Sequence, residues 1–125
     1  MQTFASGSAR LTREYGIEIG RWEQYPADHK LPFGAMWCVV PPGGRSDEDC
    51  HPELELAVVV SGGGEVEAVA TGERRPAPAG TAALMDSRER HVWHNTSADE
   101  PLVFLSVYWM PGAEASRQGT AAQDG

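Results

Sequence analysis

Cysteines, basic clusters and long apolar runs are all scarce in this chain, and each scarcity excludes a class of protein. The 125 residues include two cysteines, Cys38 and Cys50, too few for a disulfide-stabilised scaffold. The longest aliphatic runs, LAVVV and PLVFL, are far too short to span a membrane. The first residues also lack the apolar stretch of a signal peptide. We therefore expect a cytoplasmic protein with reduced thiols and no membrane partner.

Positive charge is scarce as well. Lys and Arg total 10 against 18 Asp and Glu, a formal net charge of −8, and the basic residues do not cluster beyond ERR and SRER. Such a chain has no basic face to offset phosphate repulsion, so a nucleic-acid partner is excluded. The length fits one domain with a single core.

The apolar segments are short and are separated by Gly, Pro and Asp or Asn at intervals of roughly ten residues, which is typical of a β-sandwich or barrel. No window shows helical periodicity over three turns, so the expected fold is all-β with little helix. We expect hairpins over 55–69 and 90–109 and a turn region over 71–80. The expected domain boundaries are a loose N-terminal segment over 1–12, a barrel over 13–110, and a disordered tail or linker over 111–125.

One acidic stretch, DEDCHPELE, leads directly into the apolar strand LAVVV. Strand alternation points Asp49 and His51 the same way and brings Glu55 into phase with the small Ala57. A carboxylate facing a barrel interior is costly unless a metal ion or hydrogen bonds stabilise it. His91 and Trp93 share one face of a later segment, so His91 could meet the earlier donors across a barrel.

The spacing of these residues resembles the cupin superfamily of small β-barrels. The first cupin motif, G(x)5HxH(x)3E(x)6G, is matched in every spacing from Gly43 through His51 and Glu55 to Gly62, with Asp49 in place of the first histidine. The second motif, G(x)5PxG(x)2H(x)3N, is matched in spacing from Gly80 through His91 to Asn95. Asp86 and Arg88 replace its proline and glycine. The resemblance covers about residues 34–110 and implies a jelly-roll barrel.

The resemblance also implies a ligand set for one divalent metal ion: His51, Glu55 and His91. Asp49 is either a fourth ligand, a hydrogen-bond partner of a histidine, or a solvated loop residue. Imidazole with carboxylate suits zinc, iron, manganese or nickel, and zinc is favoured here. The alternative is a cupin that kept the barrel and lost the ion.

Five other residues have competing interpretations. Arg88 replaces a turn glycine near the expected barrel mouth, where its guanidinium would clamp a substrate carboxylate, or else it is an exposed loop charge. Trp93 either lines the pocket or packs in the core. Cys38 either packs in the core or places an inward thiol near the metal ion. Cys50 is expected to be a small buried thiol, and His94 to face outward.

These features favour an enzyme that acts on a small, polar, anionic metabolite, with Arg88 and Trp93 as the catalytic candidates. A narrower resemblance is to small cupins associated with a methionyl-tRNA-synthetase-like domain, some of which are hydrazine synthetases. It implies N–N bond formation in biosynthesis and a synthetase-like partner or domain. The alternatives are an iron-dependent dioxygenase and a module that binds a small molecule without turnover. The resemblance further implies a homodimer that pairs through an exposed edge such as REYGIEIGRW.

Overall fold

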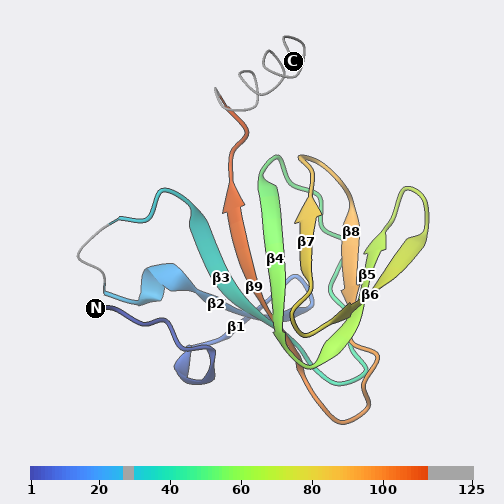
Figure 1. The fold of residues 1–125 in the computed structure, drawn as a ribbon, viewed down its shortest axis with the longest axis horizontal. Helices are drawn as coiled ribbons and strands as arrows, with labels where there is room; N and C mark the ends of the chain where they lie inside the picture. The colour runs from blue at the N-terminus through green and yellow to red at the C-terminus, as the bar shows by residue number, and fades with distance from the viewer. Residues whose placement is uncertain (27–29, 113–125) are drawn as a thin grey trace.

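A computed structural model describes residues 1–26 and 30–112, which form two antiparallel β-sheets (Figure 1). The larger sheet has six strands in the order β1-β2-β3-β9-β4-β7, and the smaller has three in the order β6-β5-β8. The strands are β1 (Thr12–Glu14), β2 (Ile17–Arg21), β3 (Gly34–Val40), β4 (Leu54–Ser61), β5 (Gly63–Ala68), β6 (Glu73–Pro78), β7 (Ala82–Met85), β8 (His91–His94) and β9 (Leu102–Trp109). The helical elements among the described residues are two short 3-10 turns, η1 (Ser6–Ser8) and η2 (Trp22–Gln24).

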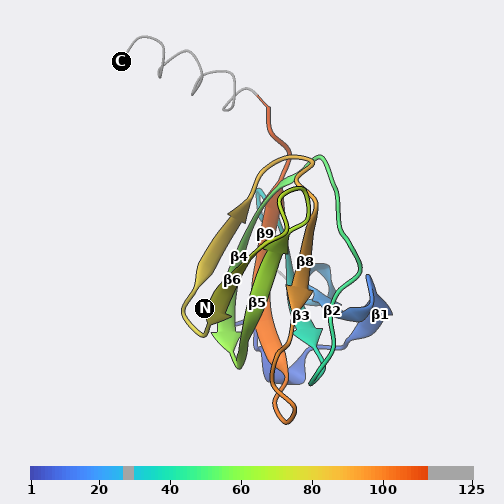
Figure 2. The same cartoon turned by 90° about the vertical axis from the view of Figure 1, so that its right-hand side faces the viewer.

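The expectation of an all-β fold with little helix is confirmed. Figure 2 shows the two sheets as facing layers, with β5, β6 and β8 in front of β4 and β9. Alternate residues of β3, β4 and β9 point between the layers and form the core, as Val40, Val59 and Phe104 illustrate. The phase expected for β4 is correct, since Glu55 and Ala57 are buried on this inner face.

The two hairpins expected from the sequence are wrong. β4 pairs with β7 and β9, whereas β5 pairs with β6 and β8, so the chain changes sheets between β4 and β5. The same change occurs between β8 and β9. Gly62 makes the first change at a φ of 73°, where a Cβ atom would overlap the carbonyl oxygen of Pro101. The glycine-rich segment between β4 and β5 therefore connects the two sheets and does not form a hairpin turn.

The turn region expected over 71–80 is wrong, because six of its residues form strand β6. The strand pairs on one side only, with β5, so it is an edge strand of the smaller sheet. Prolines are tolerated at an edge because their missing N–H groups face away from the partner strand. β7 is likewise an edge of the larger sheet.

The N-terminal residues contact the segment that follows β2. Phe4 stacks on Trp22 with ring centroids 4.3 Å apart, and the Tyr25 hydroxyl donates to the carbonyl of Ala5 at 3.1 Å. Arg10 N–H donates to the side chain of Gln24 at 2.8 Å. The boundary placed at residue 12 stays a prediction, and the expected tail lies outside the described residues from 113 onward.

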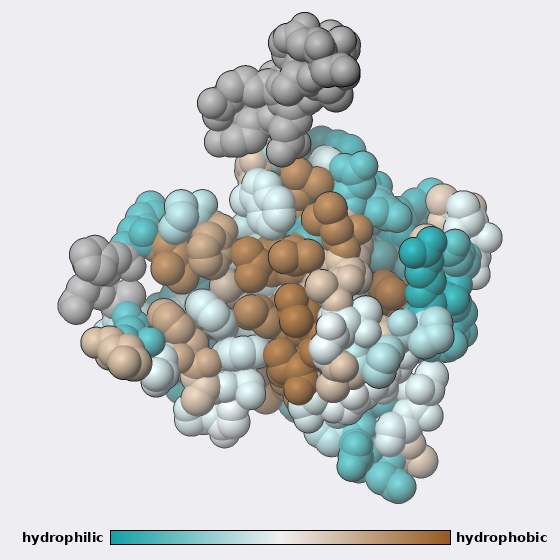
Figure 3. Space-filling model, viewed as in Figure 1, coloured by the Kyte–Doolittle hydropathy of each residue, from teal (hydrophilic) through white to brown (hydrophobic). Residues whose placement is uncertain are grey.

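The outer face of the six-stranded sheet is apolar. Figure 3 shows hydrophobic side chains gathered over β3, β9 and β4 on the face turned to the viewer. Exposed large residues that strand alternation places on this face, opposite Glu55, are Val60, Leu84 and Trp109. Among the described residues, no helix has the length and apolarity that crossing a membrane requires.

Candidate metal centre

Four side chains from separate parts of the chain converge inside one end of the barrel. Asp49, His51, Glu55 and His91 each offer a donor atom, and these atoms all lie within 4.8 Å of one another. The buried members are Glu55 and His91, with side-chain exposures of 5% and 4%. Asp49 and His51 are partly exposed, at 25% and 21%. One wall of the cluster is thus in the core and the other faces the barrel opening.

Backbone pairing explains why residues so far apart in sequence meet here. Glu55 lies near the start of β4, opposite Met85 of β7 and Tyr108 of β9. Asp49 and His91 exchange two backbone hydrogen bonds, of 3.0 and 3.1 Å, which attach the loop before β4 to the first residue of β8. The loop between β3 and β4 therefore places Asp49 and His51 beside the first residue of β8, in the smaller sheet.

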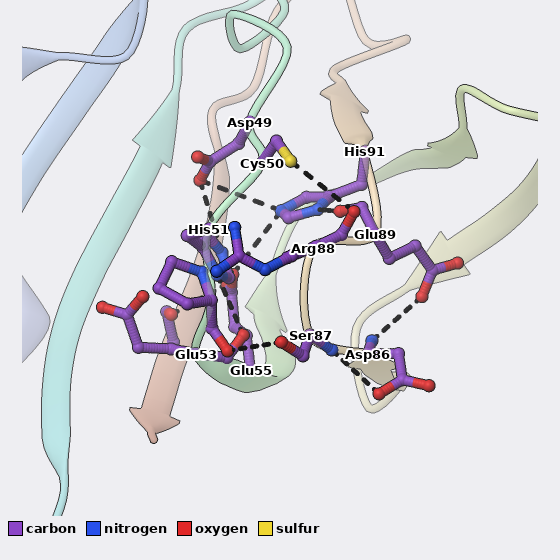
Figure 4. Close-up of polar contacts among 12 residues, drawn as sticks. Asp49, Cys50, His51, Glu53, Glu55, Asp86, Ser87, Arg88, Glu89 and His91 are labelled. Carbon is purple, nitrogen blue, oxygen red and sulfur yellow. Dashed lines mark hydrogen bonds and ion pairs between the residues drawn. The ribbon is translucent and has the colours of Figure 1, made fainter. Parts of the chain in front are cut away.

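Hydrogen bonds to the backbone orient both imidazoles. Nδ1 of His51 lies 3.0 Å from the carbonyl oxygen of Glu53, and Nδ1 of His91 lies 2.9 Å from that of Glu89. A carbonyl oxygen only accepts, so each Nδ1 carries the hydrogen, which leaves Nε2 for other partners. Both Nε2 atoms face Glu55 Oε1, at 3.0 Å from His51 and 3.5 Å from His91 (Figure 4). Backbone carbonyls commonly orient metal-binding histidines in this way.

Glu55 is a buried carboxylate whose two oxygens have different partners. Oε2 accepts a hydrogen bond of 2.8 Å from the hydroxyl of Ser106, which is fully buried on β9. Oε1 faces the two histidines. Burial alone would raise the pKa of Glu55, but the hydrogen bonds from His51, His91 and Ser106 outweigh it and lower the pKa to about 2. Glu55 is therefore ionised at neutral pH.

The carboxylates of Glu55 and Asp49 raise the pKa values of the two histidines. The hydrogen bond to Glu55 is the main reason that the pKa of His51 rises to about 9, with Asp49 adding to the effect. Burial lowers the pKa of His91, but its hydrogen bonds to Glu55 and to the Glu89 carbonyl outweigh this and raise it overall. Without a metal ion, protons bound to the imidazoles would thus take the place that a metal ion could occupy.

The residues present fit a divalent metal ion. Two imidazole nitrogens and two carboxylate oxygens point at one small volume, and such a mixed set suits zinc, iron, manganese and nickel. A cation there would compensate the buried charge of Glu55, which is costly to hold without a partner. Asp49 Oδ2 is 3.6 Å from His51 Nε2 and 3.9 Å from His91 Nε2, so Asp49 belongs to the cluster.

Arg88 lies in the loop between β7 and β8. Its backbone N–H donates to the carbonyl oxygen of His51 at 2.7 Å, and its φ of 61° is unusual for a residue other than glycine. The side chain is exposed, and among the described residues its guanidinium has no hydrogen-bond or ion-pair partner. In Figure 4 it extends from the loop in the direction of His51. Its expected contact with a substrate stays a prediction.

Trp93 shares the inner face with His91 but lies deeper. It is 2% exposed and stacks on Phe104 with ring centroids 4.3 Å apart, so its contacts here are those of a core residue. Cys38 is buried as expected, but Cys50 is exposed, and the expectation of a second buried thiol is wrong. Its Sγ lies 3.5 Å from the carbonyl oxygen of Arg88, because the loop turns it away from the donors. His94 faces outward and pairs with Glu67 at 2.7 Å.

Ser106 contributes to the site and was not predicted from the sequence. It interrupts the otherwise apolar β9 segment LVFLSVYW at an inward position. A hydroxyl on the buried face of a strand needs a partner, so this interruption was the available signal. Tyr108, two residues further along the same face, was missed as well.

Comparison with known proteins supports the fold. A family model described as a cupin domain matches residues 36–108. A Cupin 2 conserved barrel domain protein from Salinispora arenicola is 28% identical, with a TM-score of 0.71 over 97% of this chain and 96% of that chain. A Photorhabdus luminescens protein is 21% identical, with a TM-score of 0.73 over 100% and 98% of the two chains.

The polyketide cyclase RemF from Streptomyces resistomycificus is 18% identical, with a TM-score of 0.69 over 86% of this chain and 78% of that chain. At such identities the likeness concerns the fold alone. A search of proteins with curated functions finds no match. The family model spans more than half of the sequence and includes Glu55, His91 and the strands that hold them. The chain therefore belongs to the cupin-domain family.

Proposed function

We propose that this protein is a metal-dependent cupin enzyme that acts on a small polar metabolite. The observation that carries the proposal is the convergence of His51 Nε2, His91 Nε2 and oxygens of Glu55 and Asp49 at one point, with each imidazole already oriented by a backbone carbonyl. A divalent ion held there, with zinc favoured, would supply Lewis-acid activation of a bound oxygen or nitrogen group.

The chain's own residues have distinct roles in this proposal. Ser106 holds the Glu55 carboxylate in place, and the carbonyls of Glu53 and Glu89 hold the two imidazoles. Arg88 orients an anionic group of the substrate, because it carries a positive charge next to the loop that bears His51. Trp93 shares the inner face of β8 with His91 and packs against Phe104 in the core.

The reaction is open among three classes. Two imidazoles with one carboxylate resemble the triad of iron oxygenases, which favours a dioxygenase as the second candidate. N–N bond formation as the cupin part of a hydrazine synthetase, with a synthetase-like partner, rests only on resemblance in sequence. A binding module without turnover would use the same pocket. A cytoplasmic location and a homodimer are further parts of the proposal.

Metal analysis of the purified protein tests the proposal. We expect about one divalent ion per chain by mass spectrometry of the metals, and its loss from His51→Ala and His91→Ala. The matched control is His94→Ala, which removes a histidine of the same strand, β8, that faces away from the cluster. Zinc would favour Lewis-acid chemistry, and iron would favour the oxygenase. Equal metal content in all three variants would contradict the site.

A further inference from the structure

An aromatic groove lies at the rim of the six-stranded sheet, next to the start of β3 and the end of β9. Its volume is about 1170 Å³. Ligand sites for small molecules usually measure about 300–1,000 Å³, so the groove has room for much more than a group bound to one ion. The side chains that line it include six aromatic rings: Phe4, Trp22, Tyr25, Phe33, Tyr108 and Trp109.

The groove adjoins the candidate metal centre at two residues. Tyr108 on β9 is paired with Glu55 on β4, and paired side chains lie on one face with Cβ atoms about 5 Å apart. Glu53 also lines the groove, and its carbonyl oxygen accepts the hydrogen bond that orients His51. Figure 4 shows the Glu53 carboxylate directed away from the cluster. The groove is therefore lined by two residues that neighbour the donors, Tyr108 across from Glu55 and Glu53 beside His51.

The position of the Tyr108 ring depends on Gly34. The two residues are paired across β3 and β9, and a Cβ atom at position 34 would overlap the ring. The absence of a side chain at Gly34 lets the ring lie against β3, where it lines the groove. Any larger residue would have to displace it.

The opposite wall is fixed before a ligand arrives. Phe4 stacks on Trp22 with an interplanar angle of 3°, and it meets Tyr25 edge-on with centroids 5.2 Å apart. The hydroxyl of Tyr25 is bonded to the N-terminal segment at Ala5. Rings held in this way offer flat faces at a low entropic cost of binding, because their rotamers are already ordered.

We propose that the groove binds the body of the substrate, which is a planar aromatic or conjugated molecule whose oxygen donors reach the metal centre. This inference rests on the proposed function, because the metal ion would hold the oxygen-bearing head. The ring-lined walls favour a flat apolar body, since aromatic rings stack in offset or edge-on arrangements. Continuity through Tyr108 and Glu53 favours one ligand across both parts.

Three probe molecules distinguish binding of the oxygen donors at the metal ion from binding of the ring system in the groove. The first, 3-hydroxy-2-naphthoate, has a two-ring body and chelating oxygens; lactate has a chelating head alone; 2-naphthalenesulfonate has the body without the chelating pair. Calorimetry on zinc-loaded protein should give hydroxynaphthoate an affinity at least about tenfold higher than lactate. Trp109→Ala and Phe33→Ala should each reduce hydroxynaphthoate affinity about tenfold and leave lactate affinity and zinc content unchanged.

Leu84→Ala is the matched control, because Leu84 is an exposed apolar residue of the same sheet outside the groove. Gly34→Ala should lower hydroxynaphthoate affinity by displacing Tyr108, with zinc content unchanged. If that variant does not fold, Tyr108→Ala gives the same test by removing the ring instead.

The outcomes separate the two proposals. A protein that takes up no zinc, yet binds 2-naphthalenesulfonate through Trp109, would overturn the proposed function and support the groove as an aromatic site. Equal affinities for hydroxynaphthoate and lactate in zinc-loaded protein would overturn the groove inference and leave the metal site standing. Conversion of a dimer to a monomer by Trp109→Ala, with probe affinities unchanged, would assign the groove to a second copy of the chain and overturn the inference.

Discussion

At the scale of the residue, Glu55 has the most constrained environment in the site. Its carboxylate is buried, its Oε2 accepts from Ser106 and its Oε1 faces two histidines. An ionised carboxylate in such a place is stabilised by its hydrogen bonds and by positive charge beside it. Either two protonated imidazoles or a metal ion can supply that charge. Protons and metal therefore compete for one site.

This competition gives the metal-free protein a defined pH dependence. The pKa of His51 is raised from 6.5 to about 9, chiefly by its hydrogen bond to Glu55. A pKa raised in the folded state gives stability that is complete below pH 6.5 and is lost as the pH rises through about 9. Urea denaturation of chelator-treated protein should show a falling midpoint over this interval.

His51→Gln should remove most of that fall, whereas His94→Gln should keep it. Metal affinity should change in the opposite direction and rise with pH over the same interval, because imidazole must lose its proton to bind. A denaturation midpoint that is constant between pH 6.5 and 9 would contradict the raised pKa.

At the scale of the element, the passage from β4 to β5 determines which strands meet. Gly62 has a φ of 73°, and the space where its side chain would lie is filled by the backbone of Pro101 and Leu102. The crossing places β4, which carries Glu55, in one sheet and β5, which pairs with β8, in the other. The two sheets that supply the metal donors are connected at this glycine.

A side chain at Gly62 would cost free energy in two ways, through its positive φ and through overlap with the backbone of Pro101. Comparison with a second glycine of the same φ separates these two costs. Gly72 also has a φ of 73°, but nothing lies within 4 Å of its would-be Cβ atom. Gly72→Ala should therefore cost only the backbone term, about 1–2 kcal/mol of unfolding free energy. Gly62→Ala should cost clearly more, because backbone atoms must also move. Urea denaturation measures both, and equal losses would show that the contact with Pro101 relaxes freely.

At the scale of the whole molecule, the candidate metal centre joins parts that the backbone joins only loosely. Glu55 belongs to the larger sheet and His91 to the smaller one, whereas Asp49 and His51 lie in the loop from β3 to β4, which is hydrogen-bonded to β8 at His91. An ion bound by all four exists only in the folded state, so it should stabilise the fold as a whole.

Removing the metal should consequently lower the stability of the entire barrel. Free metal at about 100 times its dissociation constant adds about 2.7 kcal/mol to the free energy of unfolding. Thermal unfolding should shift upward on adding zinc and return after treatment with a chelator, with no shift in His91→Ala. A zinc-induced shift of equal size in that variant would place the bound ion elsewhere.

The site was more predictable from the sequence than the topology. Motif spacing and strand alternation identified Asp49, His51, Glu55 and His91, because a strand places residues two apart on one face whatever its partners are. Ser106 and Tyr108 were missed because their importance comes from pairing with other strands, which local pattern does not reveal. β6 was missed because its prolines are acceptable only at an edge, and edge position is a property of the assembled sheet.

The all-β class, the cupin-type spacing of the donors and the shared face of Glu55 and Ala57 could be read from the amino-acid sequence, since these follow from composition, motif spacing and alternation along single strands. The pairing of the strands, the exposure of Cys50 and the aromatic groove became known from the folded chain. Those features depend on contacts between segments distant in sequence, whose energies no local pattern of residues contains.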